Sequence, residues 1–345
     1  MNIYPIQTRE EGFLVSKLAV QVFGPLSAMV VPKCPTWGYY IQNQDDEIVA
    51  GIILKKVSSN EGVIEWIFVN PKARGHQLGP LLLDAGIQAL NKEGLIKQFA
   101  LVRDDNTSSW NMFANKGFQV TSLFKLLFGY SKASFIYRFF LIFVISGYSF
   151  WIYDESLPRN TSLRPKFSLI KSILFALFIG AAVSLFSIKG LEYFYFGLIA
   201  VVGITCLRIL FNYPFARLFG KVKFNHSQGG AIISIFEALI LGIWWPHFGY
   251  FVPIEPIWKE KSFRKYKGMA SFASWLSVIG GFVGLFYIFP ESFQAGLKPF
   301  LIPILIYQAL PFIPFEGMDG YRVFSWNKWF YLIGVALSIF VIFLF

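Results

Sequence analysis

Hydrophobic and polar positions follow two different patterns along this chain. Up to residue 134, apolar residues alternate with polar ones or recur every three or four positions, as in the strands and helices of a soluble domain. From residue 135 onward apolar runs dominate, several of them close to the roughly 20 residues that span a bilayer core. The pattern predicts two domains, a soluble one at 1–134 and an all-α, multi-span membrane domain at 135–345.

The soluble domain is expected to be a mixed α/β fold, with a sheet flanked by helices. Polar turns separate the strands, and Pro80 suits the first turn of a helix. The expected strands lie at 2–6, 37–42, 48–56, 63–69 and 99–102 and from residue 118, and the expected helices at 11–23, 80–91 and 107–115.

The second domain is expected to contain six or seven spans. The stretch 135–153 is apolar apart from Arg138, and it is either a first span or a last strand of the soluble domain; we favour a span. The later candidate spans lie at 168–186, 191–211, 229–245, 269–289, 299–312 and 329–345.

The charge follows the same division of the chain. The net charge is +11, yet residues 1–134 carry 13 basic against 11 acidic residues and the remainder 18 against 9. The basic excess therefore lies between apolar runs, which favours positive-inside loops and contact with anionic lipid head groups over nucleic-acid binding. The two cysteines, Cys34 and Cys206, exclude a disulfide framework and a multi-cysteine metal site, and we expect no metal.

The segment 69–82 carries the clearest chemical signal in the soluble domain. A strand end is followed by a loop with two glycines, Gly75 and Gly79, and then by a helix start. Backbone N–H groups at a helix N-terminus favour an anion, and glycines let the backbone approach it closely. The segment is therefore predicted to hold phosphate groups, although it matches neither a Walker loop nor a Rossmann fingerprint.

These residues resemble the GNAT acetyltransferase superfamily. The strand end Val69-Asn70-Pro71 and the loop positions Arg74, Leu78 and Gly79 fit its pyrophosphate loop, whereas Gln77 replaces the usual middle glycine. Downstream, Asn106 and Gly117-Phe118 fit a second family segment. The resemblance covers roughly residues 1–130.

The resemblance implies that acetyl-CoA is the co-substrate and that the loop amides hold its pyrophosphate. The strand that ends at Val69 would bind the pantetheine. His76 lies inside the loop, so we expect it to contact a CoA phosphate or simply to be exposed, rather than to act as an acid or base. The implied acetyl-CoA-binding residues are Ile67, Val69, Arg74, Gly75, His76, Gln77, Leu78, Gly79 and Asn106.

Two residues bear on catalysis. By strand alternation Glu65 shares a face with Ile67 and Val69, and it is either the general base that accepts the amine proton or a solvated or salt-bridged strand residue. Phe113 occupies the position where the family usually has a tyrosine that protonates the leaving thiolate, and phenylalanine has no proton to give.

The C-terminal segment 310–327 resembles the site-2 protease family of intramembrane zinc proteases. Pro314, Asp319 and Gly320 match, and in that family the aspartate is a zinc ligand; the alternative is an interfacial turn. However, the sequence contains no His-Glu-x-x-His motif, and Arg208 and Asn212 stand where it is expected. The resemblance therefore implies the fold of that family without zinc proteolysis.

Four polar residues of the second domain, Arg208, Asn212, Glu237 and Asp319, are expected at or near membrane depth. They either line a site for a lipid head group or a peptide terminus, or pair with one another as structural contacts.

The sequence thus predicts a multi-pass cell-membrane protein with a cytoplasmic N-terminal acetyltransferase domain. It would transfer acetyl from acetyl-CoA to an amine presented at the membrane, on an amino-lipid, a lipoprotein or a peptide N-terminus. The alternatives are a CoA-sensing or scaffolding membrane protein without turnover, and an intramembrane protease or transporter with an accessory domain.

Overall fold

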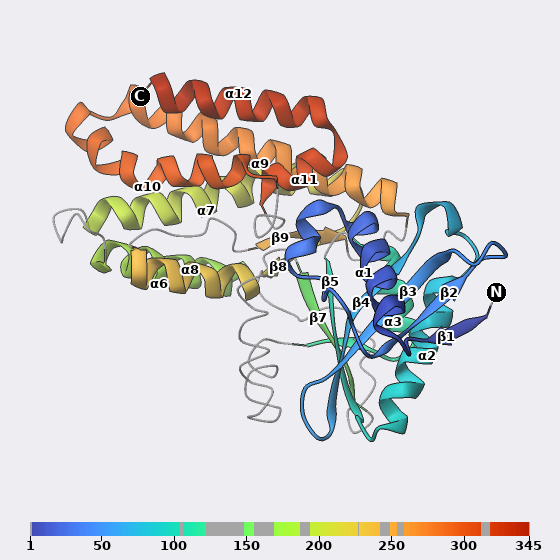
Figure 1. Cartoon of the computed structure of the whole chain (residues 1–345). Coiled ribbons are helices and arrows are strands. Elements are labelled where there is room, and N and C mark those ends of the chain that lie inside the picture. Colours follow the sequence, from blue (N-terminus) through green and yellow to red (C-terminus); the bar gives the residue numbers. More distant parts are fainter. Residues whose placement is uncertain are drawn as a thin grey trace. The chain divides into compact units, whose positions relative to one another are not determined.

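A seven-stranded mixed sheet forms the centre of the first of two structural units. The computed structural model describes residues 2–103, 106–121, 148–154, 169–186, 194–226, 228–241, 249–253, 259–311 and 318–344. The first unit takes in most of the described residues up to 154, and the second takes in those from 169 onward. The strand order is β1-β2-β3-β4-β5-β7-β6 (Figure 1).

The elements of this unit agree closely with those expected from the sequence. Strand β3 and helix α3 have the predicted bounds, and the other elements differ from the prediction at their ends. In chain order the elements are β1 (Ile3–Pro5), α1 (Arg9–Phe23), η1 (Pro25–Met29), β2 (Gly38–Gln42), β3 (Ile48–Lys56), β4 (Glu61–Val69), η2 (Pro71–Ala73), α2 (Leu78–Lys92), β5 (Lys97–Arg103), α3 (Thr107–Asn115), β6 (Gln119–Val120) and β7 (Tyr148–Asp154).

Alternate residues of the central strands supply two separate cores. Ile52 packs with Leu82 in one core, whereas the next residue along the strand, Ile53, packs with Val15 in the other. Helix α2 therefore covers one face of the sheet and α1 the other. Gly86 allows α2 to approach closely, because a Cβ there would lie 2.6 Å from the Cδ1 of Ile52.

Strand β7 corrects the favoured interpretation of the stretch 135–153 as a membrane span. Residues 148–154 pair with β6, with Gln119 opposite Ile152, and Trp151 is buried in the core beside α2 and α3. The sheet of the first unit thus extends beyond residue 134, where the sequence placed the end of the soluble domain. The earlier part of the stretch, 135–147, lies outside the described residues.

A capping box begins helix α1. The Thr8 hydroxyl accepts from the N–H of Glu11, and the Glu11 carboxylate accepts from the N–H groups of Gln7 and Thr8 at 2.8 Å each. The Tyr40 hydroxyl also donates to Glu11, at 2.9 Å. These bonds lower the pKa of Glu11, chiefly through the Gln7 and Thr8 amides, while burial raises the pKa of Tyr40 to about 12 and keeps it a neutral donor.

Because the pKa of Glu11 is lower in the folded state than in the unfolded state, its stabilising effect is present at neutral pH. That effect is lost as the pH falls through the folded pKa. We expect Glu11→Gln to lower the melting temperature at pH 7 and to converge on the wild type once the pH falls below the lowered pKa of Glu11 in the folded state. Glu10→Gln, in the same first turn, is the control and should track the wild type. A difference in melting temperature between Glu11→Gln and the wild type that does not change with pH would contradict this account of Glu11.

The second unit consists of helices and one hairpin. Its helices occupy the six later candidate spans, with α9 starting well before the predicted residue 269, and an additional short helix, α11, follows the Pro-rich segment. The elements are α6 (Leu169–Phe186), α7 (Phe194–Arg217), β8 (Val222–His226), α8 (Gln228–Leu241), β9 (Gly249–Pro253), α9 (Glu260–Ile288), α10 (Glu291–Ala309), α11 (Asp319–Trp326) and α12 (Lys328–Leu344), and β8 pairs antiparallel with β9.

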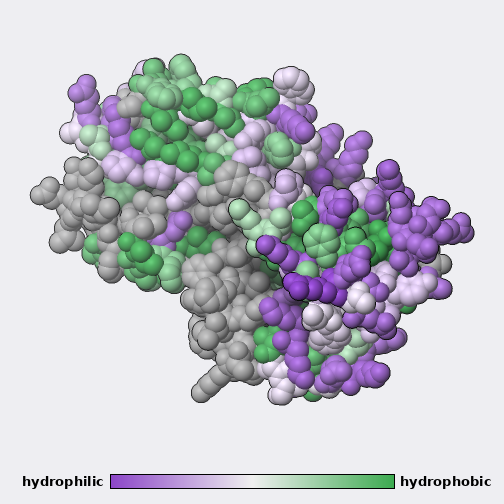
Figure 2. Space-filling view, viewed as in Figure 1, coloured by the Kyte–Doolittle hydropathy of each residue, from purple (hydrophilic) through white to green (hydrophobic). Residues whose placement is uncertain are grey.

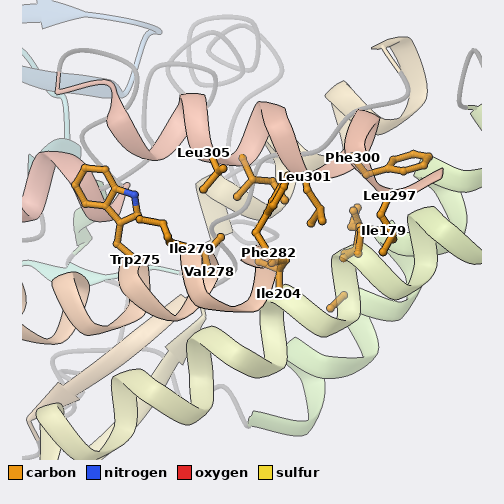
Figure 3. Packing of buried hydrophobic residues seen from close by; sticks show 14 of the residues in the cluster. Ile179, Ile204, Trp275, Val278, Ile279, Phe282, Leu297, Phe300, Leu301 and Leu305 are labelled. Carbon is orange, nitrogen blue, oxygen red and sulfur yellow. The ribbon is translucent and has the colours of Figure 1, made fainter. Parts of the chain in front are cut away.

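One apolar core joins the helices of this unit. Side chains of α6, α7, α9 and α10 meet in it, and they point toward one another in Figure 3. Trp275 of α9 is fully buried, and its indole N–H donates to Ser338 Oγ of α12 at 3.0 Å. Buried aromatic and branched side chains thus hold α9, α10 and α12 together.

The expectation of six or seven spans is not confirmed. Among the described residues, one helix, Tyr195–Arg217 within α7, is long and apolar enough to cross a membrane, and Ile173–Ala182 and Lys328–Leu344 are apolar but shorter. Large apolar side chains are nevertheless exposed along α12, including Trp329, Phe340 and Phe343 (Figure 2). An exposed apolar surface of this kind is typical of a face that contacts lipid or another protein.

Candidate functional site

Strand β4 contains a bulge at Glu65. Ile53 of β3 lies opposite Trp66, but the next residue, Leu54, lies opposite Ile64, so Glu65 has no Cα partner on β3. Bulges re-aim side chains and are frequent beside active sites. The bulge also means that counting alternate residues from Val69 does not determine the face of Glu65, contrary to the sequence argument.

The carboxylate of Glu65 lies beside a lysine of the neighbouring strand. Its Oε1 is 3.3 Å from Lys55 Nζ, and the Glu65 side chain is only 12% exposed. The salt-bridged interpretation of Glu65 is therefore seen directly. It does not exclude a role as general base, because a carboxylate in an ion pair can still accept a proton.

The pairing of β4 with β5 stops halfway along β4. The two strands are parallel, and their register runs from Glu61–Lys97 to Ile64–Ala100, with no pair beyond it in the described strands. The second half of β4, which includes Ile67 and Val69, therefore has a sheet edge that β5 does not cover. Such an edge offers backbone N–H and C=O groups to an extended ligand.

The loop after β4 leads into an uncapped helix N-terminus. Gly75 has φ +92° and Gln77 has φ +56°, both in the left-handed region. Gln77 precedes α2 without any side-chain cap, and the first turn of α2 contains no acidic residue. The amides of the first turn are therefore available to an anion.

The predicted loop residues are exposed around a single buried anchor. Arg74, Gly75, His76 and Gln77 are exposed, whereas Leu78 is buried and packs in the core beneath α2. Gly79 lets the first turn of α2 lie close to Met112 of α3, because a Cβ on Gly79 would come within 3.3 Å of the Met112 Sδ. The loop therefore exposes backbone amides at the start of α2, with the exposed Arg74 guanidinium in the same loop.

Helix α3 supplies no acid at the position of Phe113. Asn106 lies directly before α3, and its N–H donates to the carbonyl of Arg103 at 3.0 Å. The Phe113 ring is buried and makes an edge contact with Phe118 at 5.0 Å between centroids. Phe113 is thus a core residue of the first unit, and its ring carries no titratable group.

Three of the four polar residues predicted for the second domain meet at one pocket. Arg208 donates to Asp319 Oδ2 from Nη2 at 2.8 Å and from Nε at 3.1 Å. Both residues line this pocket together with Asn212, whose amide donates to the Ala270 carbonyl at 3.0 Å. Glu237 does not line it and instead accepts from Tyr307 at 3.4 Å.

Three features of these sites had no signal in the sequence. Lys55, the bulge at Glu65 and the end of β4–β5 pairing all depend on strand register. Register is set by the packing of the whole sheet, so a local sequence motif does not predict it.

Comparison with known proteins supports a GNAT acetyltransferase domain in the first part of the chain. Residues 15–118 match the sequence family described as the acetyltransferase (GNAT) family. No curated protein sequence matches the chain.

Several solved structures resemble part of the chain. One is a protein of Mycobacterium tuberculosis in complex with CoA, with 17% identity over 45% of this chain and 99% of that chain and a TM-score of 0.34. Another is a GNAT family acetyltransferase of Staphylococcus aureus, with 17% identity, 44% and 98% coverage and a TM-score of 0.34. A GNAT family acetyltransferase of Elizabethkingia anophelis with acetyl-CoA bound has 14% identity, 44% and 97% coverage and a TM-score of 0.30.

Proposed function

We propose that this protein is a membrane-bound N-acetyltransferase that transfers the acetyl group of acetyl-CoA to an amine presented at the membrane. The observation that carries the proposal is the uncovered edge of β4, which leads directly to the uncapped N-terminus of α2. An extended chain that ends in a pyrophosphate fits this combination, and residues 15–118 match a family of acetyltransferases.

In the proposed complex, the amides at the start of α2 hold the pyrophosphate, and Arg74 and His76 contact CoA phosphates. The free edge of β4 at Ile67 and Val69 pairs with the pantetheine, and an amide near Val69 polarises the thioester carbonyl. The amine nitrogen attacks the carbonyl carbon, the C–S bond breaks, and CoA leaves as a thiolate. Glu65, directly or through a water, accepts the proton that the amine loses.

The membrane placement belongs to the same proposal. With residues 148–154 in the sheet, the six later apolar stretches remain as candidate spans, and a multi-pass chain follows from them. The acetyltransferase domain would face the cytoplasm, where acetyl-CoA is found. The acceptor amine would then be carried by an amino-lipid, a lipoprotein or a peptide N-terminus, and the helical domain would retain the fold of a site-2 protease without its chemistry.

A calorimetric titration of the detergent-purified full-length protein with acetyl-CoA tests the proposal. We expect saturable binding in the micromolar range. Absence of heat up to high micromolar acetyl-CoA would overturn the acetyltransferase function.

Glu65→Gln separates cofactor binding from turnover. We expect kcat for acetylation of membrane amines, followed by mass spectrometry of lipids and lipoproteins, to fall by about 10²–10⁴-fold because the base is lost. Acetyl-CoA affinity should stay within about twofold of the wild type. Lys55→Met, which keeps the stem but removes the ammonium, should lower kcat less. An unchanged product level in Glu65→Gln would remove Glu65 as the base.

A CoA-binding protein without turnover is the second candidate function. It is favoured by the buried Phe113, which places no proton donor where the family usually has one. If acetyl-CoA binds but no acetylated lipid, lipoprotein or peptide accumulates, this second function replaces the first.

A further inference from the structure

Helix α9 is longer than a bilayer core is thick, and its basic residues are confined to one end. Its 29 residues rise about 43 Å, whereas the hydrocarbon core of a bilayer measures about 30 Å. Residues 269–288 contain no charged side chain, and the four basic residues of the helix all lie within 261–267. In a chain whose residues 269–288 span the bilayer, the start of α9 therefore projects out of the hydrocarbon core.

The end of helix α7 lies beside the start of α9. Asn212 donates to the Ala270 carbonyl at 3.0 Å, so the two helices are in contact there. Further along α7, Ala216 packs in a buried cluster with Phe263 of α9 and Phe251 of β9. This end of the second unit, made up of residues 213–226, 249–253 and 259–268, is called the basic end below.

The chain leaves the basic end through helix α8 and returns to it. His226, at the end of β8, pairs with Gly249, at the start of β9, so the segment 227–248 begins and ends at the same place. Helix α8 (Gln228–Leu241) rises about 21 Å, which is less than the thickness of a bilayer core. Of the six candidate spans, α8 therefore does not cross a bilayer, and the end of α7 and the start of α9 belong to one side.

An excess of basic residues sets this end apart from the opposite end of the second unit. Segment 213–226 contains three basic and no acidic residues, and segment 259–268 contains five basic residues and one acidic residue. At the opposite end, the segments 187–193 and 289–298, which follow α6 and α9, each contain one basic and one acidic residue. An excess of Lys and Arg is typical of the cytoplasmic side of a multi-span protein.

Four cations of the basic end are exposed: Arg217, Lys221, Lys261 and Lys265. Lys261 and Lys265 are one helical turn apart and share a face of α9. None of the four makes an ion pair within the part of the chain that the structure describes. Their ammonium and guanidinium groups are therefore available to phosphate oxygens.

Aromatic side chains lie at the level where the charges of α9 stop. A Cβ on Gly268 would overlap the side chain of Trp326, so α11 ends against this point of α9. Trp326 stacks on Phe330 of α12 at 5.0 Å between ring centroids, and Trp329, at the start of that helix, is 76% exposed. An exposed tryptophan near lysines, at the border of an apolar segment, is typical of the head-group level of a bilayer.

We propose that the basic end is a docking surface for acidic phospholipids of the cytoplasmic leaflet. Their phosphate oxygens accept from the exposed lysines and from Arg217, and Trp329 lies among the head groups. A phospholipid without net charge fits less well, because its own cation faces the cations of the protein. Exposed apolar side chains of the same end, such as Leu218, favour a lipid surface over an acidic protein.

This docking rests on the membrane placement in the proposed function, and it adds an orientation and a lipid partner. The basic end would face the cytoplasm, the side proposed for the acetyltransferase domain. Lipid binding there uses neither acetyl-CoA nor Glu65, so a failure of the docking would leave the proposed acetyl transfer untouched.

Native mass spectrometry of the detergent-purified full-length protein with two phospholipids of identical acyl chains tests the docking. We expect phosphatidylglycerol, which is anionic, to bind at least about 10-fold more tightly than phosphatidylcholine, which has no net charge. Equal affinity would overturn the docking surface, and binding of neither lipid would contradict the membrane placement as well. Soluble glycerol 1-phosphate is a third arm: competition at the same concentration as phosphatidylglycerol would show a site for a free anion and would also overturn the docking surface.

Neutralising the four exposed cations tests where the preference arises. The quadruple variant carries Arg217→Gln, Lys221→Gln, Lys261→Gln and Lys265→Gln. We expect the two lipids to bind to it within about twofold of each other, and the exposed positions should tolerate the changes without loss of structure. A preference that is retained in a variant that melts with the wild type would overturn the proposal.

The matched control removes four exposed positive charges from the first unit instead: Lys17→Gln, Lys33→Gln, Lys56→Gln and Lys92→Gln. It has the same net charge as the quadruple variant and should keep the preference for phosphatidylglycerol. An equal loss in both variants would mean that net charge determines the preference, and would overturn the proposal. Should the quadruple variant fail to fold, Lys261→Gln/Lys265→Gln carries the test, with an expected loss of at least about threefold in the preference.

Discussion

Gly79→Val will weaken acetyl-CoA binding by about 100-fold, which corresponds to about 2.7 kcal/mol. Gly79 is the second residue of α2, directly beside the amides that hold the pyrophosphate in the proposed complex. A valine there has to find room against the Sδ of Met112, which a Cβ would already approach to 3.3 Å, so the first turn of α2 has to shift and its amides move from the positions that hold the pyrophosphate in the proposed complex. Calorimetry with acetyl-CoA measures the loss.

Gln77→Gly is the matched control in the same loop. Gln77 adopts φ +56°, a conformation that costs a non-glycine residue about 1–2 kcal/mol, so glycine relieves strain without adding bulk. We expect binding to be retained or strengthened and the melting temperature to be unchanged or higher. If Gly79→Val binds acetyl-CoA as the wild type does, the helix N-terminus is not the pyrophosphate site.

Asp319→Ala will destabilise the second unit by about 3–5 kcal/mol, because it leaves the buried Arg208 guanidinium without its counter-charge. Arg208 is 9% exposed and Asp319 1% exposed, so solvent replaces the lost partner only in small part. Thermal and denaturant unfolding in detergent micelles measures the change, with the helical signal as the readout of this unit.

Asp319→Asn is the matched comparison, since it keeps the shape and can still accept from Arg208 and Ser274. The loss of unfolding free energy in Asp319→Asn should be clearly smaller than the loss in Asp319→Ala. Replacing both partners, as in Arg208→Met/Asp319→Leu, should recover much of the loss because no charge then remains buried alone. A loss below about 1 kcal/mol in Asp319→Ala would mean that water reaches Arg208 and that the pair is not buried in solution.

Local sequence patterns were sufficient to predict most helices and strands of the first unit. The alternation at 48–56 and the helical spacing at 107–115 predicted β3 and α3 with their observed bounds. The Val69-to-Leu82 segment correctly predicted a strand end, a loop with glycines and a helix start. These features depend on neighbours in sequence, so single-sequence reasoning reaches them.

Long-range pairing was beyond local patterns. Residues 148–153 end an apolar stretch that the sequence favoured as a membrane span, and only their place in the sheet, between β5 and β6, makes them a strand. Likewise, α11 follows from packing: its second residue, Gly320, lies so close to α10 that a Cβ would overlap the Gln308 carbonyl oxygen. The charge on Asp319 suggested a site, but its partner Arg208 lies 111 residues away.

The sequence by itself determined the division into a mixed α/β domain and a helical region. It also determined the segment 69–82, which is predicted to hold phosphate groups, and the absence of a proton donor at Phe113. Each of these features follows from the types of neighbouring residues and their spacing along the chain. Only the tertiary structure decided that β4 bulges at Glu65, that its second half is left uncovered by β5, and that Arg208, Asn212 and Asp319 share one pocket. Strand register and helix contacts follow from how side chains distant in the chain fill a common core, and no local pattern encodes that.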